Sequence, residues 1–91
     1  MEMIAVWLKV DGEHLVETLQ AARQKLDAAE GEVVLDLSSV RRLDPNALKA
    51  LQELAAAADQ KTIKVGLRGA NIDLYKVLKL VKLAPRFSFL N

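Results

Sequence analysis

Apolar runs of strand length alternate with segments of helical periodicity along the chain, and this alternation restricts the fold more than any other feature. The strand-like runs lie at residues 3–8, 32–37, 62–67 and 87–90. The helical segments between them lie at about 13–29, 45–59 and 71–82. This order is typical of a small α/β domain with a mainly parallel or mixed sheet of about four strands and three helices. No linker or repeat separates the elements, so we expect residues 1–91 to form a single domain.

The apolar positions of the helical segments predict which side chains form the core. In the first segment these positions are Leu15, Leu19, Ala22, Leu26 and Ala29. In the last segment they are Leu74, Val77, Leu78 and Val81. Trp7 lies inside the first strand-like run, so we expect it to be buried in the core, with an anchor at the sheet edge as the alternative.

Asp44-Pro45-Asn46 is a strong start signal for the second helix. An aspartate carboxylate accepts hydrogen bonds from free N–H groups of the first turn, and proline suits the first helical position because its missing N–H costs nothing there. In a parallel sheet, ligands usually meet the carboxyl ends of the strands, which is where this helix begins. Two interpretations of Asp44 therefore stay open, namely a helix cap alone or a cap within a recognition site.

Composition argues against an enzyme and for a binding module. The chain has no cysteine and a single histidine, His14, so thiolate metal sites and the common zinc sites are excluded. We therefore expect no metal and no cofactor. The net charge of +1 and the few aromatic residues argue against generic nucleic-acid binding. No apolar run approaches the length of a membrane span and the start is acidic, so we expect a cytoplasmic location without membrane insertion.

The small net charge hides two opposed regions. Residues 1–60 carry six basic and eleven acidic side chains, a charge of −5, whereas residues 61–91 carry seven basic and one acidic, a charge of +6. The basic region predicts a secondary partner-binding surface, an apolar strip rimmed by lysines, made of Lys76, Lys79, Leu80, Lys82 and Leu83. A solvated lysine face beside a wide core stripe is the alternative, and contact with acidic lipid headgroups is a third.

The segment Val33–Val40, with the sequence VVLDLSSV, is followed by Leu43-Asp44 and an apolar helix, and it resembles the central signature of the STAS family. The later segment Val65–Asn71 and the helix after it are also similar to the family in order and spacing. The family includes anti-sigma factor antagonists and the cytoplasmic tails of sulfate transporters. The resemblance covers about residues 12–91 and implies a STAS-like fold and a non-catalytic, protein-binding regulatory role in bacteria.

At the helix start the chain departs from the family pattern. Many members carry a hydroxyl residue directly after the aspartate, and a partner kinase phosphorylates it to switch off binding to an anti-sigma factor. Pro45 and Asn46 stand there instead, and neither side chain can accept a phosphoryl group. We therefore expect a module that is not switched at this site and that binds an anti-sigma factor or a kinase-like protein. The resemblance places partner binding at Ser38, Ser39, Asp44, Pro45, Asn46 and Lys49.

A second interpretation comes from the later part of the chain. Gly69-Ala70-Asn71, Tyr75 and Lys79-Leu80 look similar to the small STAS subunit of the bacterial lipid-asymmetry ABC transporter. This resemblance implies docking on the transporter ATPase, although Pro45 departs from that pattern too. Nucleotide binding, suggested for some family members, lacks a glycine-rich phosphate loop here. The oligomeric state is open at this point.

Overall fold

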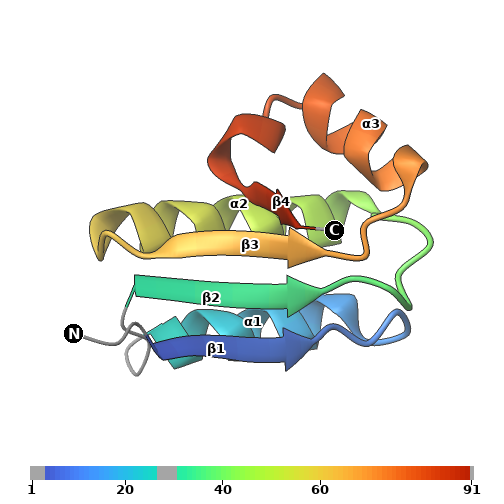
Figure 1. The fold of residues 1–91 in the computed structure, drawn as a ribbon. Helices are drawn as coiled ribbons and strands as arrows, with labels where there is room; N and C mark the ends of the chain where they lie inside the picture. Colours follow the sequence, from blue (N-terminus) through green and yellow to red (C-terminus); the bar gives the residue numbers. More distant parts are fainter. Residues whose placement is uncertain (1–3, 27–30, 91) are drawn as a thin grey trace.

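The computed structural model describes residues 4–26 and 31–90, which form a four-stranded sheet and three α-helices (Figure 1). The strands are β1 (Ile4–Lys9), β2 (Gly31–Asp36), β3 (Lys64–Arg68) and β4 (Ser88–Leu90). The helices are α1 (Leu15–Lys25), α2 (Pro45–Gln60), α3 (Ile72–Leu80) and the short 3-10 helix η2 (Ala84–Arg86). The strand and helix order predicted from the alternation is confirmed.

The four strands lie across the sheet in chain order, β1-β2-β3-β4, and each neighbouring pair is parallel. Among the described strands the sheet is therefore parallel rather than mixed. Figure 1 shows α1 and α2 side by side against one face of the sheet, with α3 and η2 beyond β3 and β4. Because the strands are parallel, their carboxyl ends meet at one edge.

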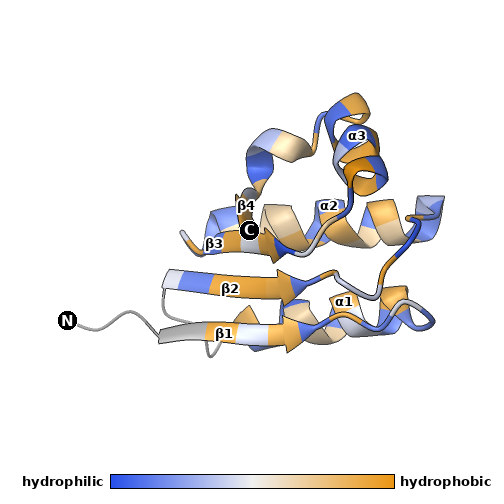
Figure 2. Ribbon diagram, turned by 45° about the vertical axis from the view of Figure 1, so that its right-hand side comes forward, coloured by the Kyte–Doolittle hydropathy of each residue, from blue (hydrophilic) through white to orange (hydrophobic). Residues whose placement is uncertain are grey.

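The core lies between the sheet and its helices and is apolar throughout the described residues, since no polar or charged side chain there is buried. Figure 2 shows the hydrophobic centre of β2 and β3 beside the hydrophobic faces of α1 and α2. From the sheet, the fully buried side chains that join the core include Val33, Leu35 and Leu67. From the helices they include Leu19, Ala22, Leu51, Leu54, Leu74 and Leu78. Among the described helices, none has the length and hydropathy needed to cross a bilayer.

Of the two helix ends predicted from the periodicity, the structure tests one. The predicted end of the first helix, including Ala29, lies outside the described residues, whereas Leu26 is buried as expected. The third helix ends at Leu80 instead of residue 82, because Lys82 has a φ of 65° and the N–H of Leu83 donates to the carbonyl of Leu78 at 2.8 Å. Val81 is the C-cap of α3 and 44% of it is exposed, so its expected burial is wrong.

Two side chains differ from the prediction in whether they are buried or exposed. Leu83, expected on the secondary surface, is 6% exposed, because the chain reversal after α3 returns it to the core. Trp7, expected in the core, is 55% exposed on the edge strand β1. It lies on the sheet face that does not join the helix-facing core, and the guanidinium of Arg68 sits 5.4 Å from its ring centroid.

A pair of leucine substitutions tests this division into core and surface. We expect Leu51→Ala to lower the free energy of unfolding by about 2–5 kcal/mol, because it leaves a cavity in the core. Leu80→Ala is the matched control, since that side chain is 82% exposed, and its effect should stay within about 0.5 kcal/mol. Urea denaturation followed by circular dichroism measures both, and losses of equal size would contradict the packing described.

Candidate functional site

The segment Ser38–Leu43, called the connector below, joins the end of β2 to the start of α2 at the edge where the parallel strands end. Two hydrogen bonds continue the sheet past the strand ends. The N–H of Val10 donates to the carbonyl of Asp36 at 2.9 Å, and the N–H of Leu37 donates to the carbonyl of Arg68 at 2.7 Å. The connector therefore starts from a point fixed by both neighbouring strands.

Further hydrogen bonds fix the middle of the connector. The hydroxyl of Ser39 donates to the carbonyl of Val10 at 2.9 Å, which ties the connector to the end of β1. The side-chain amide of Asn71 donates to the carbonyl of Val40 at 3.4 Å, which ties it to the start of α3. Val40 itself is 2% exposed and belongs to the core. The connector is thus a constrained segment held from two sides.

Two glycines allow the neighbouring turns to approach the connector this closely. A Cβ atom on Gly12, in the turn before α1, would lie 2.4 Å from the carbonyl oxygen of Ser39. A Cβ atom on Gly69, after β3, would lie 3.1 Å from the Cβ of Ser38, and its φ of +74° also favours glycine. The connector therefore passes between two backbone turns, one with no space for a side chain at Gly12 and one with little space at Gly69.

The Asp36 carboxylate at the end of β2 organises the start of the connector. Its pKa lies below the ordinary value of 3.8, mainly because the backbone N–H of Ser38 donates to it at 2.9 Å. The hydroxyl of Ser38 also hydrogen-bonds to it, and the positive charges of Arg68 and Lys9 act in the same direction. The carboxylate thus remains ionised, and the hydroxyl of Ser38 is engaged.

The start of α2 confirms the helix signal predicted from the sequence. Asp44 is the N-cap in extended conformation, and its carboxylate accepts from the N–H of Ala47 at 2.7 Å. Pro45 occupies the first helical position, and Asn46 and Lys49 are exposed on the first turns. Asp44, Pro45 and Asn46 together with the connector are called the Asp44 corner below. The structure thus brings Ser38, Ser39, Asp44, Pro45, Asn46 and Lys49 to one end of the sheet.

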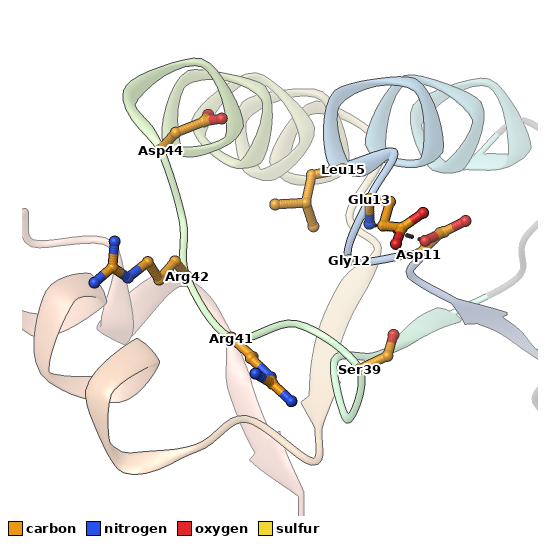
Figure 3. A pocket seen from close by; sticks show the side chains of 8 residues that line it. All are labelled: Asp11, Gly12, Glu13, Leu15, Ser39, Arg41, Arg42 and Asp44. Atoms are coloured by element: carbon orange, nitrogen blue, oxygen red, sulfur yellow. Dashed lines mark hydrogen bonds between the residues drawn. The ribbon is translucent and has the colours of Figure 1, made fainter.

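An open hollow of about 700 Å³ lies beside this corner, between the connector and the turn before α1. Figure 3 shows the side chains that line it. Its lining includes Ser39 and Asp44 with two residues that the sequence interpretation did not single out, Arg41 and Arg42. Their side chains diverge to opposite sides of the connector (Figure 3). The sequence signal that could have identified them is a pair of adjacent arginines in a predicted connector. Within the described residues, no group of three or more histidine, cysteine or acidic side chains could hold a metal ion.

Substitution of Gly12 tests whether close backbone contact holds the connector. We expect Gly12→Ala to lower the free energy of unfolding by about 1–3 kcal/mol, because the added methyl group forces Ser39 away. Glu13→Ala is the control, since the exposed neighbour keeps its N–H bond to Asp11, and its effect should stay within about 0.5 kcal/mol. Amide chemical shifts of Ser39 and Val40 should move only in the glycine variant. A Gly12→Ala protein as stable as wild type would contradict the contact.

Comparison with known proteins agrees with this architecture. No curated protein sequence matches the chain. A putative anti-sigma factor antagonist from Thermotoga maritima superposes with a TM-score of 0.77 at 16% identity, over 99% of this chain and 83% of the other. A sulfate transporter family protein from Wolinella succinogenes gives 0.77 at 16% identity, over 93% and 75%. The SulP transporter STAS domain from Vibrio cholerae gives 0.78 at 20% identity, over 99% and 75%.

At these low identities the TM-scores establish a shared fold and no more. The family itself is shown by a family model described as "Mlab, STAS domain", which matches residues 3–85 and therefore most of the chain. The sequence signature from Val33 to Asp44 corresponds to strand β2 of the parallel sheet, the connector that follows it and the N-cap of α2. The chain belongs to the STAS family.

Proposed function

We propose that this STAS domain is a non-catalytic module that binds a partner protein through the Asp44 corner. The observation that carries the proposal is an exposed corner on a fixed backbone, because hydrogen bonds and glycine contacts fix the connector that leads into α2, where Asn46 and Lys49 are exposed. A surface already ordered before binding loses little conformational entropy when the partner docks. This geometry favours recognition at the corner over a cap with no further role.

We further propose that the corner is not switched by phosphorylation. Pro45 and Asn46 follow the cap where many family members carry a hydroxyl, and neither can accept a phosphoryl group. The two hydroxyls nearby are engaged, that of Ser38 with Asp36 and that of Ser39 with the Val10 carbonyl. Phosphorylation of either serine would break these bonds. The proposed consequence is constitutive binding.

Our first choice of partner is an anti-sigma factor, a kinase-like protein. The sequence resemblance to anti-sigma factor antagonists supports it, and the fold shared with the Thermotoga maritima protein is compatible with it. In this role the chain acts in the bacterial cytoplasm and carries out no reaction of its own. Binding then depends on the shape and polarity of the corner rather than on reactive side chains.

The second candidate is the STAS subunit of a lipid-asymmetry ABC transporter, which docks on the transporter ATPase. The description of the matching family, "Mlab, STAS domain", favours it specifically. Both candidates are protein-binding roles. They differ in the partner, so the partner's identity separates them.

Affinity capture with the full chain tests the corner and identifies the partner. We expect wild type to retain an anti-sigma factor or an ABC ATPase from lysate of the source cells, as identified by mass spectrometry. Asn46→Lys should lower its recovery about tenfold, because it places a charged, longer side chain in the interface. Gln52→Lys adds the same charge at an exposed position farther along α2 and should leave recovery unchanged. Equal recovery with both variants would contradict partner binding through the Asp44 corner.

Intact-mass measurement tests the absence of a phosphorylation switch. After incubation with the captured kinase-like partner, Mg²⁺ and ATP, we expect the mass of the wild-type chain to remain unchanged. Pro45→Ser supplies a hydroxyl at the first helical position and should gain a single phosphoryl group, transferred from ATP with release of ADP. Phosphate found on Ser38 or Ser39 of wild type would overturn the proposal.

A further inference from the structure

Exposed large apolar side chains concentrate around α3. Six such residues occur in the described part of the chain, and all except Trp7 lie on α3, directly after it or on β4, namely Ile72, Tyr75, Leu80, Val81 and Phe89. Ile72 is 72% and Leu80 82% exposed, whereas Leu74 and Leu78 on the other side of the helix are buried. Single exposed apolar residues are ordinary, but a cluster on one element marks an interaction surface.

Lysines accompany these apolar residues. Lys76 and Lys79 lie on the exposed side of α3, and Lys82 follows in the turn. The ion pairs of the described residues lie elsewhere, between Arg23 and Glu53 and between Arg86 and Asp59, so none of them neutralises these three lysines. We call the set Ile72, Lys76, Lys79, Leu80 and Lys82 the α3 surface.

The α3 surface is continuous with the Asp44 corner. A hollow of about 730 Å³ lies between the connector and α3, lined by Arg41 and Arg42 on one side and by Asp73 and Lys76 on the other. The hydrogen bond from Asn71 to Val40 fixes the start of α3 against the connector. Arg41 and Arg42 thus lie across this hollow from Lys76, and Lys79 and Lys82 extend the positive charge along α3 to its far flank. These five basic residues are called the cationic band, and with Asp73 their net charge is +4.

On its other flank α3 offers an apolar hollow. A space of about 440 Å³ is lined by Tyr75, Phe89 and Pro85, with Lys79 and Lys82 also at its wall. Tyr75 and Phe89 meet edge to face with ring centroids 4.9 Å apart, which gives the hollow an aromatic wall. The aromatic wall complements an apolar side chain of a partner, and the two lysines complement partner carboxylates beside it.

We propose that the α3 surface and the two connector arginines form one docking surface for an acidic segment of the partner protein that also carries apolar side chains. This inference rests on the proposed function and adds the chemistry of the partner. Carboxylates complement the cationic band, while apolar side chains cover Ile72 and Leu80 and enter the hollow beside Tyr75. The interleaved apolar residues and Asp73 favour a protein over a nucleic acid, and a nine-residue helix without tryptophan or phenylalanine favours a protein over a membrane.

The test is an NMR titration of the full chain with a synthetic helical peptide of glutamate and leucine. We expect amide shifts confined to α3, the connector and β4. The double charge reversal Lys76→Glu with Lys79→Glu should weaken binding about tenfold or more, because it replaces attraction with repulsion. Ile72→Ser with Leu80→Ser should weaken binding several-fold without unfolding, since both side chains are exposed. An absence of shifts, or the same affinity for every variant, would overturn the inference.

Matched controls separate this surface from general charge effects. Lys25→Glu with Lys64→Glu changes the net charge equally at exposed positions on other elements and should alter the affinity by less than about twofold. A peptide with lysine in place of glutamate should not bind. Vesicles of equal parts phosphatidylcholine and phosphatidylglycerol, and a mixed-sequence single-stranded RNA, test the other macromolecules, and tighter binding to either than to the acidic peptide would contradict the inference.

The captured partner distinguishes this inference from the proposed function. If Asn46→Lys abolishes partner binding while the α3 charge reversal leaves it intact, the corner is the interface and the inference is wrong. If the charge reversal abolishes binding while Asn46→Lys leaves it intact, the acidic contact stands and the proposed corner fails. Loss with both variants supports a single continuous surface.

Discussion

The close passage of the connector between the Gly12 and Gly69 turns is the contact on which the proposed binding end of this molecule depends. The Gly12 turn leaves no space for a Cβ atom against the connector backbone and the Gly69 turn leaves little, so the ends of β1, β2 and β3 lie in close main-chain contact. Hydrogen bonds from Val10 and Leu37 continue the sheet to the same place. The start of α2 inherits its position from this arrangement, because Asp44 follows the connector directly.

One consequence concerns the distribution of charge around the corner. The ionised Asp36 lies between Lys9 and Arg68 in the register of the sheet, and its carboxylate is satisfied by Ser38. The local carboxylates are thus used inside the structure, as a turn acceptor and, at Asp44, as a helix cap. Among the described residues no ion pair engages Arg41 or Arg42, so the charge of the two connector arginines is available to another molecule.

Much of the fold could be predicted from the sequence because strand-like runs and helical periodicity alternate without ambiguity, and because Asp44-Pro45 marks a helix start by local chemistry. Trp7 and Leu83 were misplaced for tertiary reasons. Periodicity cannot tell which sheet face the helices will cover, and it cannot foresee the left-handed residue Lys82 that returns Leu83 to the core. Arg41 and Arg42 line a hollow together with α3, and the position of that helix against the connector cannot be predicted from a local sequence pattern.

The contact between Arg68 and Trp7 has a practical consequence. Trp7 is the one tryptophan of the chain, and a guanidinium lies over its partly exposed ring. Arg68 also supplies the carbonyl that holds Leu37 and directly precedes Gly69 beside the connector. Indole emission is sensitive to nearby charge and to solvent, so the intrinsic fluorescence of the unlabelled protein is an optical reporter of movement at this end of the sheet.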